Sequence, residues 1–302
     1  TIVGSLAGDA ITDADFNTVL GFNALTTNQL GSTSIAIGAE ALHTQKPDSA
    51  TDMFNTAVGH QAGYAMTTGV QNTTIGGLAG DALTTGSENI SMGYLALTSD
   101  TAGTRAVAIG TQALQNQNFS SSQDNYNVAI GFQAGLSVTT GLQNVLIGGI
   151  VRDAITDADF NIAIGYGALG ANTVGSKSVA IGQGTLVNQN PGSATDMNNV
   201  AIGHQAGNDI TTGTGNVCLG SLAGDAITTG TDNILIGRAV AASAVDSANQ
   251  IVMGDNVTGN ANQSFLFGKD STDSAIAFGA TTITAPSDVR LKEDIQDEEI
   301  GL

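Results

Sequence analysis

Apolar and polar residues alternate in short stretches along this chain, and each stretch ends in a glycine. Aliphatic residues or Thr stand three and one positions before the glycine, with a small residue between them, as in Val128, Ala129 and Ile130 before Gly131. Alternation at period two with β-branched residues is typical of a β-strand with one buried face. We therefore expect a short strand before each glycine, with its aliphatic residues turned inward.

These repeat glycines return at a nearly constant spacing. Short rungs, with a glycine-to-glycine spacing of 17, come in threes and are separated by one long rung with a spacing of 21, so that four rungs make a super-repeat with a period of 72. The repeat glycines are Gly4, Gly21, Gly38, Gly59, Gly76, Gly93, Gly110, Gly131, Gly148, Gly165, Gly182, Gly203, Gly220, Gly237 and Gly254. Self-similarity at a short fixed period is the signature of a solenoid, in which each rung buries its apolar side by stacking on the next. The sequence predicts an all-β parallel β-solenoid or β-roll over residues 1–259.

Composition favours a thin fibre over a globular enzyme. The chain has 40 Gly, no Trp, 4% aromatic residues and 12% charged residues, so its core must consist mainly of Ala, Val and Ile. Narrow solenoids of this kind need partners to bury enough surface. We expect an elongated parallel homotrimer, about 70 Å long at about 4.8 Å per rung.

The formal net charge of −19, or −57 for three copies, disfavours nucleic acid and anionic membranes as partners. No apolar run is long enough to span a membrane, so we expect no membrane insertion. Because the first residue is Thr1 rather than Met, we expect the chain to be part of a longer protein.

Asn stands four residues before most repeat glycines, as at Asn144 and Asn161. Stacked Asn side chains at a solenoid corner can bond amide to amide and tolerate left-handed turns, so we interpret this column as structural. Cys218 takes a position where other repeats have Ala, which predicts a small buried residue and excludes a disulfide framework within the chain.

Histidine and aspartate are the candidate metal ligands. His60 and His204 follow repeat glycines, but the equivalent residue between them is Phe132, which indicates packing; three copies of one His around a trimer axis remain the alternative. His43 is expected to be exposed in a loop. The clusters Asp9, Asp13, Asp15 and Asp153, Asp157, Asp159 lack the pattern of a calcium loop, and we expect solvated turns. No cofactor or metal is expected.

The long rungs carry four extra residues each, in the polar stretches 43–54, 115–126 and 187–198. Solenoids accommodate insertions as loops on one face, and such loops often bind partners. Spacers inherited by duplication are the alternative interpretation.

After Gly254 the regular pattern gives way to glycines at 268 and 279, and then to the string Ser287, Asp288, Val289, Arg290, Leu291, Lys292. This string resembles the S-D-x-R-L-K entry motif of the C-terminal intramolecular chaperone domain of phage tail spikes, tail fibres and endosialidases. The resemblance implies that residues 260–286 form a β neck and that residues 287–302 begin the chaperone. It also implies that the chaperone helps the fibre to trimerise and then cuts itself off.

In that interpretation Ser287 is the nucleophile and Lys292 its base, with cleavage between Ser287 and Asp288. A neutral lysine can activate serine once folding has desolvated it. The alternative is that this segment only begins a charged helix after Pro286. The shaft itself is not expected to be an enzyme.

The upstream rungs resemble the N-x-x-A-I-G repeats of trimeric autotransporter adhesin heads, which are parallel β-rolls. The two resemblances together imply a phage tail fibre or spike shaft that attaches a virion tail to a host-cell receptor, a glycan among the candidates, and contacts other tail proteins. The alternatives are a trimeric adhesin on a bacterial surface and, less favoured, a tail spike that degrades polysaccharide. The last would need two carboxylates in a cleft, and the regular Asp turns offer no unique pair.

Overall fold

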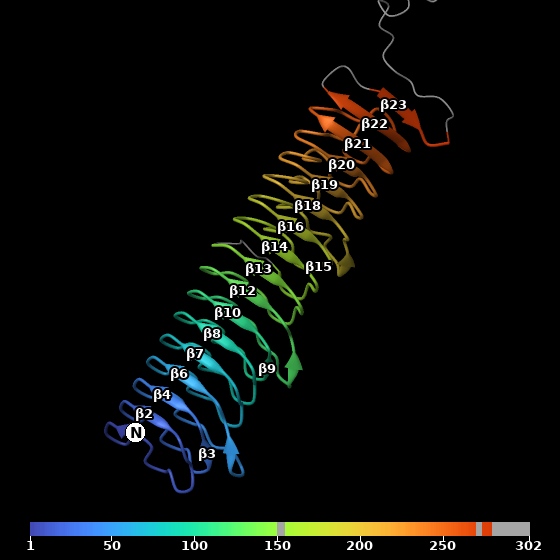
Figure 1. Cartoon of the computed structure of the whole chain (residues 1–302). Helices are drawn as coiled ribbons and strands as arrows, with labels where there is room; N and C mark the ends of the chain where they lie inside the picture. Colours follow the sequence, from blue (N-terminus) through green and yellow to red (C-terminus); the bar gives the residue numbers. More distant parts are fainter. Residues whose placement is uncertain (150–154, 270–273, 280–302) are drawn as a thin grey trace, which may run out of the picture.

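The computed structural model describes residues 1–149, 155–269 and 274–279, and these ranges contain strands and turns but no helix. They form a parallel β-solenoid of about 15 turns that rises as a straight rod from the N-terminus (Figure 1). The prediction of an all-β parallel solenoid is confirmed.

Each turn contributes one short strand before its repeat glycine. Each long rung and the turn before it add a two-residue strand, and β22 and β23 follow the last repeat glycine. The strands are β1 (Ile2–Val3), β2 (Thr18–Leu20), β3 (Gly31–Ser32), β4 (Ile35–Ile37), β5 (Thr51–Asp52), β6 (Thr56–Val58), β7 (Thr73–Ile75), β8 (Ile90–Met92), β9 (Gly103–Thr104), β10 (Val107–Ile109), β11 (Gln123–Asp124), β12 (Val128–Ile130), β13 (Val145–Ile147), β14 (Ile162–Ile164), β15 (Gly175–Ser176), β16 (Val179–Ile181), β17 (Thr195–Asp196), β18 (Val200–Ile202), β19 (Val217–Leu219), β20 (Ile234–Ile236), β21 (Gln250–Asp255), β22 (Ser264–Lys269) and β23 (Ser274–Ala277).

The strands before the 15 repeat glycines, together with β22 and β23, pair side by side into a 17-stranded sheet that runs the length of the rod. Its pairings are parallel from β1 to β22, and equivalent residues face each other, as Ala129 of β12 faces Leu146 of β13. At the C-terminal end β23 pairs antiparallel with β22, so Phe265 faces Ile276. The described residues of 260–286 thus end the parallel sheet with a reversed strand, and residues 287–302 lie outside the described part.

The expectation that the aliphatic strand residues point inward was wrong. The small middle residue of each strand is the buried one: Ala129, Ala163 and Cys218 have no exposed surface. The larger flanking residues point outward, and Ile130 and Ile202 remain 36% and 40% exposed. The physical reason is the narrow interior. The segment that follows each repeat glycine, which we call the second wall, lies close beneath the sheet, so that most of the side chains between them must be small.

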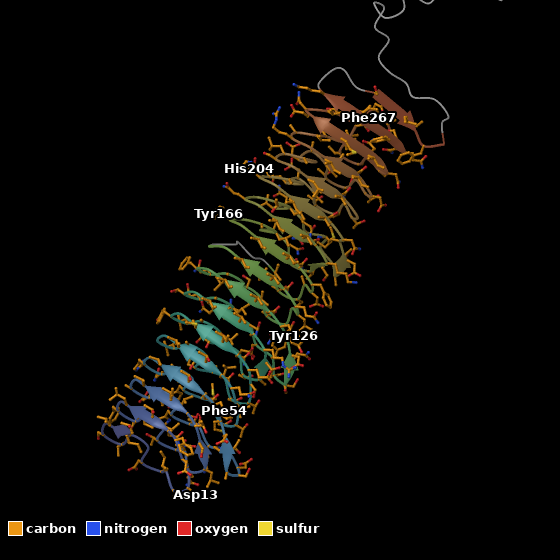
Figure 2. All side chains as sticks on the ribbon, in the orientation of Figure 1. Asp13, Phe54, Tyr126, Tyr166, His204 and Phe267 are labelled. Atoms are coloured by element: carbon orange, nitrogen blue, oxygen red, sulfur yellow. The ribbon has the colours of Figure 1, made fainter. Side chains whose placement is uncertain are left out.

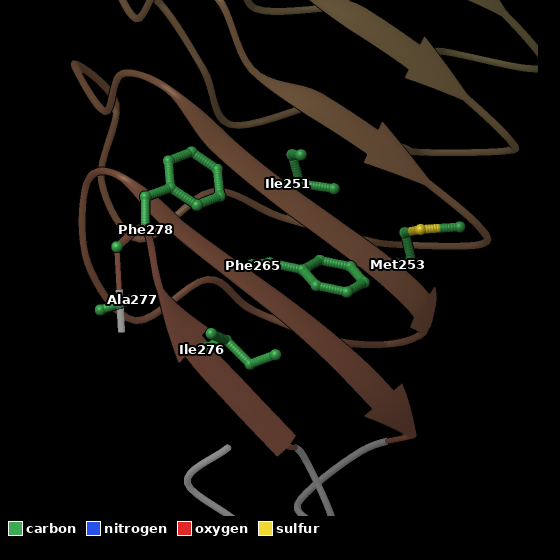
Figure 3. Close-up of a pocket in the computed structure, with 7 residues that line it drawn as sticks. Ile251, Met253, Phe265, Ile276, Ala277 and Phe278 are labelled. Carbon is green, nitrogen blue, oxygen red and sulfur yellow. The ribbon is translucent and has the colours of Figure 1, made fainter. Parts of the chain in front are cut away.

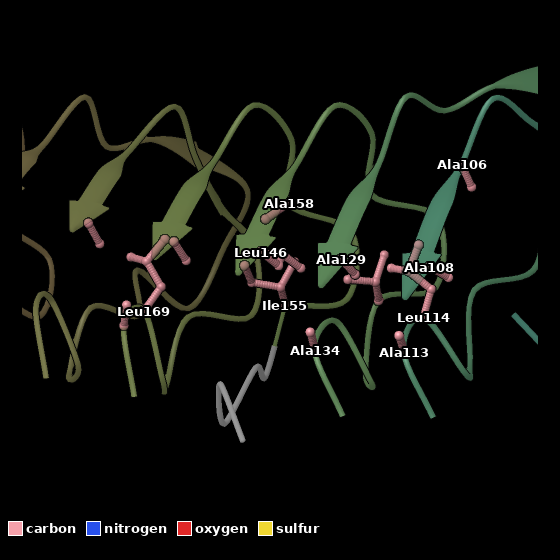
Figure 4. Close-up of a cluster of buried hydrophobic side chains, with 14 of the residues drawn as sticks. Ala106, Ala108, Ala113, Leu114, Ala129, Ala134, Leu146, Ile155, Ala158 and Leu169 are labelled. Carbon is pink, nitrogen blue, oxygen red and sulfur yellow. The ribbon is translucent and has the colours of Figure 1, made fainter. Parts of the chain in front are cut away.

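The core is a thin layer between the sheet and this second wall. Figure 4 shows Ala129, Leu146 and Leu169 directed into the layer, together with Ala134 and Leu114. Within the second wall, the sizes of the side chains four and seven positions after the repeat glycine compensate each other. Where one turn has Leu114, the residue three positions later is Gln117; where another has Gly80, it is Leu83, whose Cδ1 lies 3.0 Å from the place of a Cβ on that glycine.

The column of Asn residues fastens each turn to the next. In Asn144 the side-chain amide donates to the Ala158 carbonyl (2.8 Å), and its oxygen accepts from the backbone N–H of Asn161 (3.0 Å). An amide-to-amide bond exists between Asn144 and Asn127 at 3.3 Å, but most of the bonding is to the backbone. These buried side chains therefore satisfy corner backbone groups that no strand pairing reaches.

The glycine positions require glycine. Gly131 has φ of +134°, and a Cβ placed on it would lie 2.2 Å from the carbonyl oxygen of Gly148. Gly131→Val is expected to lower the free energy of unfolding by more than about 3 kcal/mol or to prevent folding, because backbone strain and a backbone clash act together. Cys218→Ala, the control, should change it by less than about 1 kcal/mol. Urea denaturation followed by circular dichroism measures both, and equal tolerance would contradict the assignment.

Loss of an Asn clamp leaves two buried backbone groups without partners. Asn144→Ala is expected to cost about 2–4 kcal/mol of unfolding free energy. The matched control is Ser178→Ala in the same column, because the chain itself has Ala106 at the equivalent position one super-repeat earlier. Chemical denaturation compares the two variants, and an equal effect would show that the Asn hydrogen bonds contribute nothing specific.

Candidate interaction face

The outer surface of the long sheet is the most distinctive surface of the rod. We call the residues three and one positions before each repeat glycine the aliphatic columns. They are half-buried to exposed, and include Ile35, Val107, Ile109, Ile164 and Ile236. Since the strands pair residue for residue, these side chains form two continuous lines along the rod, which are apolar except where Thr takes the place, as at Thr18, Thr56 and Thr73.

Two further columns border the aliphatic columns. The corner column consists of the residues five positions before each repeat glycine, and includes Phe54 and Tyr126. The glycine-adjacent column consists of the residues directly after it, and includes Tyr166 and His204. Figure 2 labels the first pair along one long edge of the rod and the second pair along the other. The four columns together make up the candidate interaction face.

The corner column has left-handed backbone geometry. Phe16, Phe54, Tyr126 and Phe160 have φ between 50° and 60°, which is uncommon for aromatic residues. The buried Asn that follows fixes the turn and turns the preceding side chain outward. Phe16 is 87% exposed, so its large apolar ring is covered by no side chain in the described ranges.

An apolar hollow continues this face at the C-terminal end. It has a volume of about 440 Å³ and is lined by Ile251, Met253, Phe265 and Ile276, with Phe278 at its rim (Figure 3). Ile251 and Met253 belong to the aliphatic columns, and the Phe265 and Phe267 rings lie 5.3 Å apart. The reversed strand β23 therefore extends the apolar surface past the last repeat glycine.

The three long rungs form short sheets at the corner of the solenoid. β5, β11 and β17 pair in parallel with β3, β9 and β15 of the turn before. An Asp in each holds the corner column: Asp52 accepts from Thr33 (2.8 Å), Asp124 pairs with Arg105, and Asp196 pairs with Lys177 (2.5 Å). The loops are therefore fastened to the shaft.

Buried glutamines anchor the same loops from inside. Gln45, Gln117 and Gln189 accept from the side-chain amides of Asn55, Asn127 and Asn199 at 3.0, 2.9 and 2.9 Å. Sequence reasoning missed them, although their spacing of one super-repeat was a usable signal. Beside β11 lies a hollow of about 280 Å³ lined by Asn118, Phe119, Ser121 and Thr140. That the loops bind a partner stays a prediction, as does the alternative that they are spacers.

Arg105 forms the densest polar cluster of the face. It donates to Glu88 (3.0 Å) and to the Tyr126 hydroxyl (3.0 Å), and its guanidinium lies 5.7 Å from the centre of the Tyr126 ring. These bonds, first of all the one to Glu88, raise the pKa of Arg105. The pKa of Asp124 is lowered, chiefly by the hydrogen bond from Thr104 and also by the charge of Arg105.

The histidines do not gather. His60 and His204 are exposed on the glycine-adjacent column, eight turns apart. His43 is half-buried and stacks on Tyr64 with ring centres 4.9 Å apart, so the expectation of an exposed loop residue was wrong. In the ranges that the structure describes, no three His, Cys, Asp or Glu side chains are placed to hold a metal ion.

Asp9, Asp13 and Asp15 are exposed, as expected of solvated turns, whereas the second cluster bonds to a neighbouring turn. Asp157 accepts from the hydroxyls of Thr139 (2.8 Å) and Thr140 (2.7 Å), which lowers its pKa, and Asp159 accepts from the backbone of Leu142 (2.7 Å). Asp153 lies outside the described residues. Asp225, on the second wall, has its pKa raised by burial and by the charge of Asp209.

Cys218 is buried, as expected, and desolvation raises its pKa to about 12. The remaining predicted site residues, Ser287 and Lys292, lie outside the described residues together with Asp288. No helix long and apolar enough to cross a membrane occurs in the described ranges.

Comparison with protein-family models, curated proteins and solved structures finds no match for this chain. The candidate interaction face is therefore interpreted from its own side chains. It offers a long apolar surface with aromatic edges, and such a surface is suited to packing against another protein chain.

Proposed function

We propose that this chain is the shaft of an elongated parallel homotrimer, a phage tail fibre or tail spike that helps a virion attach to its host. The observation that carries the proposal is the apolar outer face of the sheet, which runs along the rod and which no other described part of the chain covers.

The size of this face argues for a partner. About 14 rung steps at about 4.8 Å, and a width of six residues at about 3.3 Å, give an area on the order of 1,000 Å². Monomeric soluble proteins rarely expose apolar patches larger than a few hundred Å². A second and third copy, placed parallel with their short and long rungs at matching heights, would cover the face along its length.

Two further features support a fibre. The thin core buries little apolar surface per residue, so a single rod gains little stability from its interior. The formal charge of −19 keeps such an assembly soluble and disfavours nucleic acid. In this proposal the fibre contacts other tail proteins and a host-surface receptor, a glycan among the candidates.

The resemblance of the segment from Ser287 to Lys292 to a self-cleaving trimerisation chaperone supports the viral form of the proposal. A trimeric adhesin on a bacterial surface is the second candidate, because the strands with sequences such as Val-Ala-Ile-Gly after a buried Asn resemble adhesin heads. Both candidates require the same homotrimeric shaft.

Charge placed in the aliphatic columns tests the trimer. Ile147→Lys combined with Ile164→Lys introduces two ammonium groups on neighbouring turns of the face. We expect the trimer to dissociate, since each buried charge would lack a partner. The control is Asn188→Lys on the exposed second wall, which should leave the trimer intact.

Analytical ultracentrifugation gives the mass of each variant, and circular dichroism shows whether the β-structure persists. A wild-type chain that sediments as a compact monomer would overturn the homotrimer.

Maturation is tested on the full-length precursor. We expect it to trimerise and then be cleaved between Ser287 and Asp288, because Lys292 becomes a competent base only when folding desolvates it. Ser287→Ala should leave an intact trimer with the chaperone attached, and Lys292→Ala should slow cleavage. A denaturing gel and mass measurement give the result. Cleavage of Ser287→Ala at the same site would contradict the assignment.

A further inference from the structure

The glycine-adjacent column alternates in side-chain size from one turn to the next. Every second turn carries a flat or bulky residue: Phe22, His60, Tyr94, Phe132, Tyr166 and His204. The turns between carry smaller or flexible residues: Ser5, Ala39, Gly77, Thr111, Gly149 and Gln183. The bulky side chains reach toward the turn before them, since Tyr94 Cδ2 lies at an ordinary contact distance of 3.6 Å from the place of a Cβ on Gly77.

The corner column places its own aromatic residues in the same alternate turns. Phe16, Phe54, Tyr126 and Phe160 share their turns with Phe22, His60, Phe132 and Tyr166. Within one chain the two columns cannot touch, because six residues of nearly extended backbone separate them by roughly 15–20 Å. Yet the two edges match in chemical character at each of these heights.

Two polar pairs of the columns match as well, although Glu88 shares its turn with Tyr94. Asp232 shares its turn with Arg238, and Asn198 shares its turn with His204. No turn in the described part of the shaft has like charges in the two columns. A shift of one turn that places Asp232 opposite Asp255 would also set the aromatic residues of the corner column against Ala, Gly and Gln.

Parallel copies related by rotation about the rod axis bring these edges together. If each copy turns its aliphatic columns toward a common axis, the corner column of one copy meets the glycine-adjacent column of the next at the same height. An antiparallel arrangement would pair unequal turns instead. The match within each turn therefore favours a second parallel copy over a ligand or an unrelated protein as the partner of the edges.

We infer that the corner column of each copy packs against the glycine-adjacent column of its neighbour, turn by turn, and that the alternation of bulky and small residues sets the axial register of the assembly. The inference rests on the proposed homotrimer and assigns the residues that join its copies. Aromatic pairs such as Phe160 with the neighbour's Tyr166 supply packing, and Asp232 with the neighbour's Arg238 supplies charge complementarity.

Disulfide cross-linking tests the pairing directly. Asn198→Cys combined with His204→Cys puts two thiols at opposite edges of one turn, on exposed polar positions whose loss spares the aromatic pairs. A disulfide needs Cα atoms within about 7 Å, so the two thiols cannot join within a chain. Buried Cys218 does not compete. Mild oxidation should convert most of the protein into a covalent trimer on a non-reducing denaturing gel.

The control pair is Asn198→Cys with Arg238→Cys, which lies two turns apart and is offset by about 10 Å along the rod. It should cross-link at least tenfold more slowly. Equal cross-linking of both pairs would overturn the proposed register. A trimer by ultracentrifugation that gives no cross-link from the matched pair would overturn the edge pairing but leave the homotrimer standing. A monomer would overturn both.

Discussion

The close approach of successive backbones at the repeat glycines is the constraint on which the rest of the structure depends. At Gly131 the chain adopts a positive φ and passes so near Gly148 that no side chain fits between them. Because the same approach recurs at nearly every turn, the turns superpose with little freedom to slide or tilt. Every other position of the repeat is then held in a column, and each column acquires one environment along the whole rod.

The columns contribute unequally to the stability of the rod. Inside, small residues such as Ala129 and Ala163 fill a layer too thin to bury much apolar surface, and each Asn clamp satisfies two backbone groups of the next turn. The interior therefore specifies the fold with good hydrogen bonding but modest hydrophobic burial. The larger aliphatic residues lie outside, so much of the apolar side-chain surface of the sheet is not buried within a single rod.

The sequence was sufficient to predict the solenoid and the place of each strand before a repeat glycine, because the glycine spacing and the β-branched residues carry both, but not the short corner strands such as β5 and β11. It did not reveal which face of a strand is inside, since Val-Ala-Ile alternates equally well in either direction. Only the width of the interior decides between Ala129 and its larger neighbours, and that width depends on the second wall. Side-chain contacts between neighbouring turns, such as the stack of His43 on Tyr64 and the bonds from Thr139 and Thr140 to Asp157, were likewise hidden.

The candidate face was harder to predict than the fold, because its pattern spans two turns instead of one. The flat and bulky residues after the repeat glycines are visible in the sequence, but their partners on the corner column become meaningful only when both columns are placed on one surface. Each super-repeat holds four turns, and four is a multiple of the two-turn alternation. Each duplication of such a block therefore extends the face without bringing a bulky turn next to another bulky turn. A block of three turns would have broken the alternation at every junction, so the length of the super-repeat and the chemistry of the outer face are consistent with selection for the same surface.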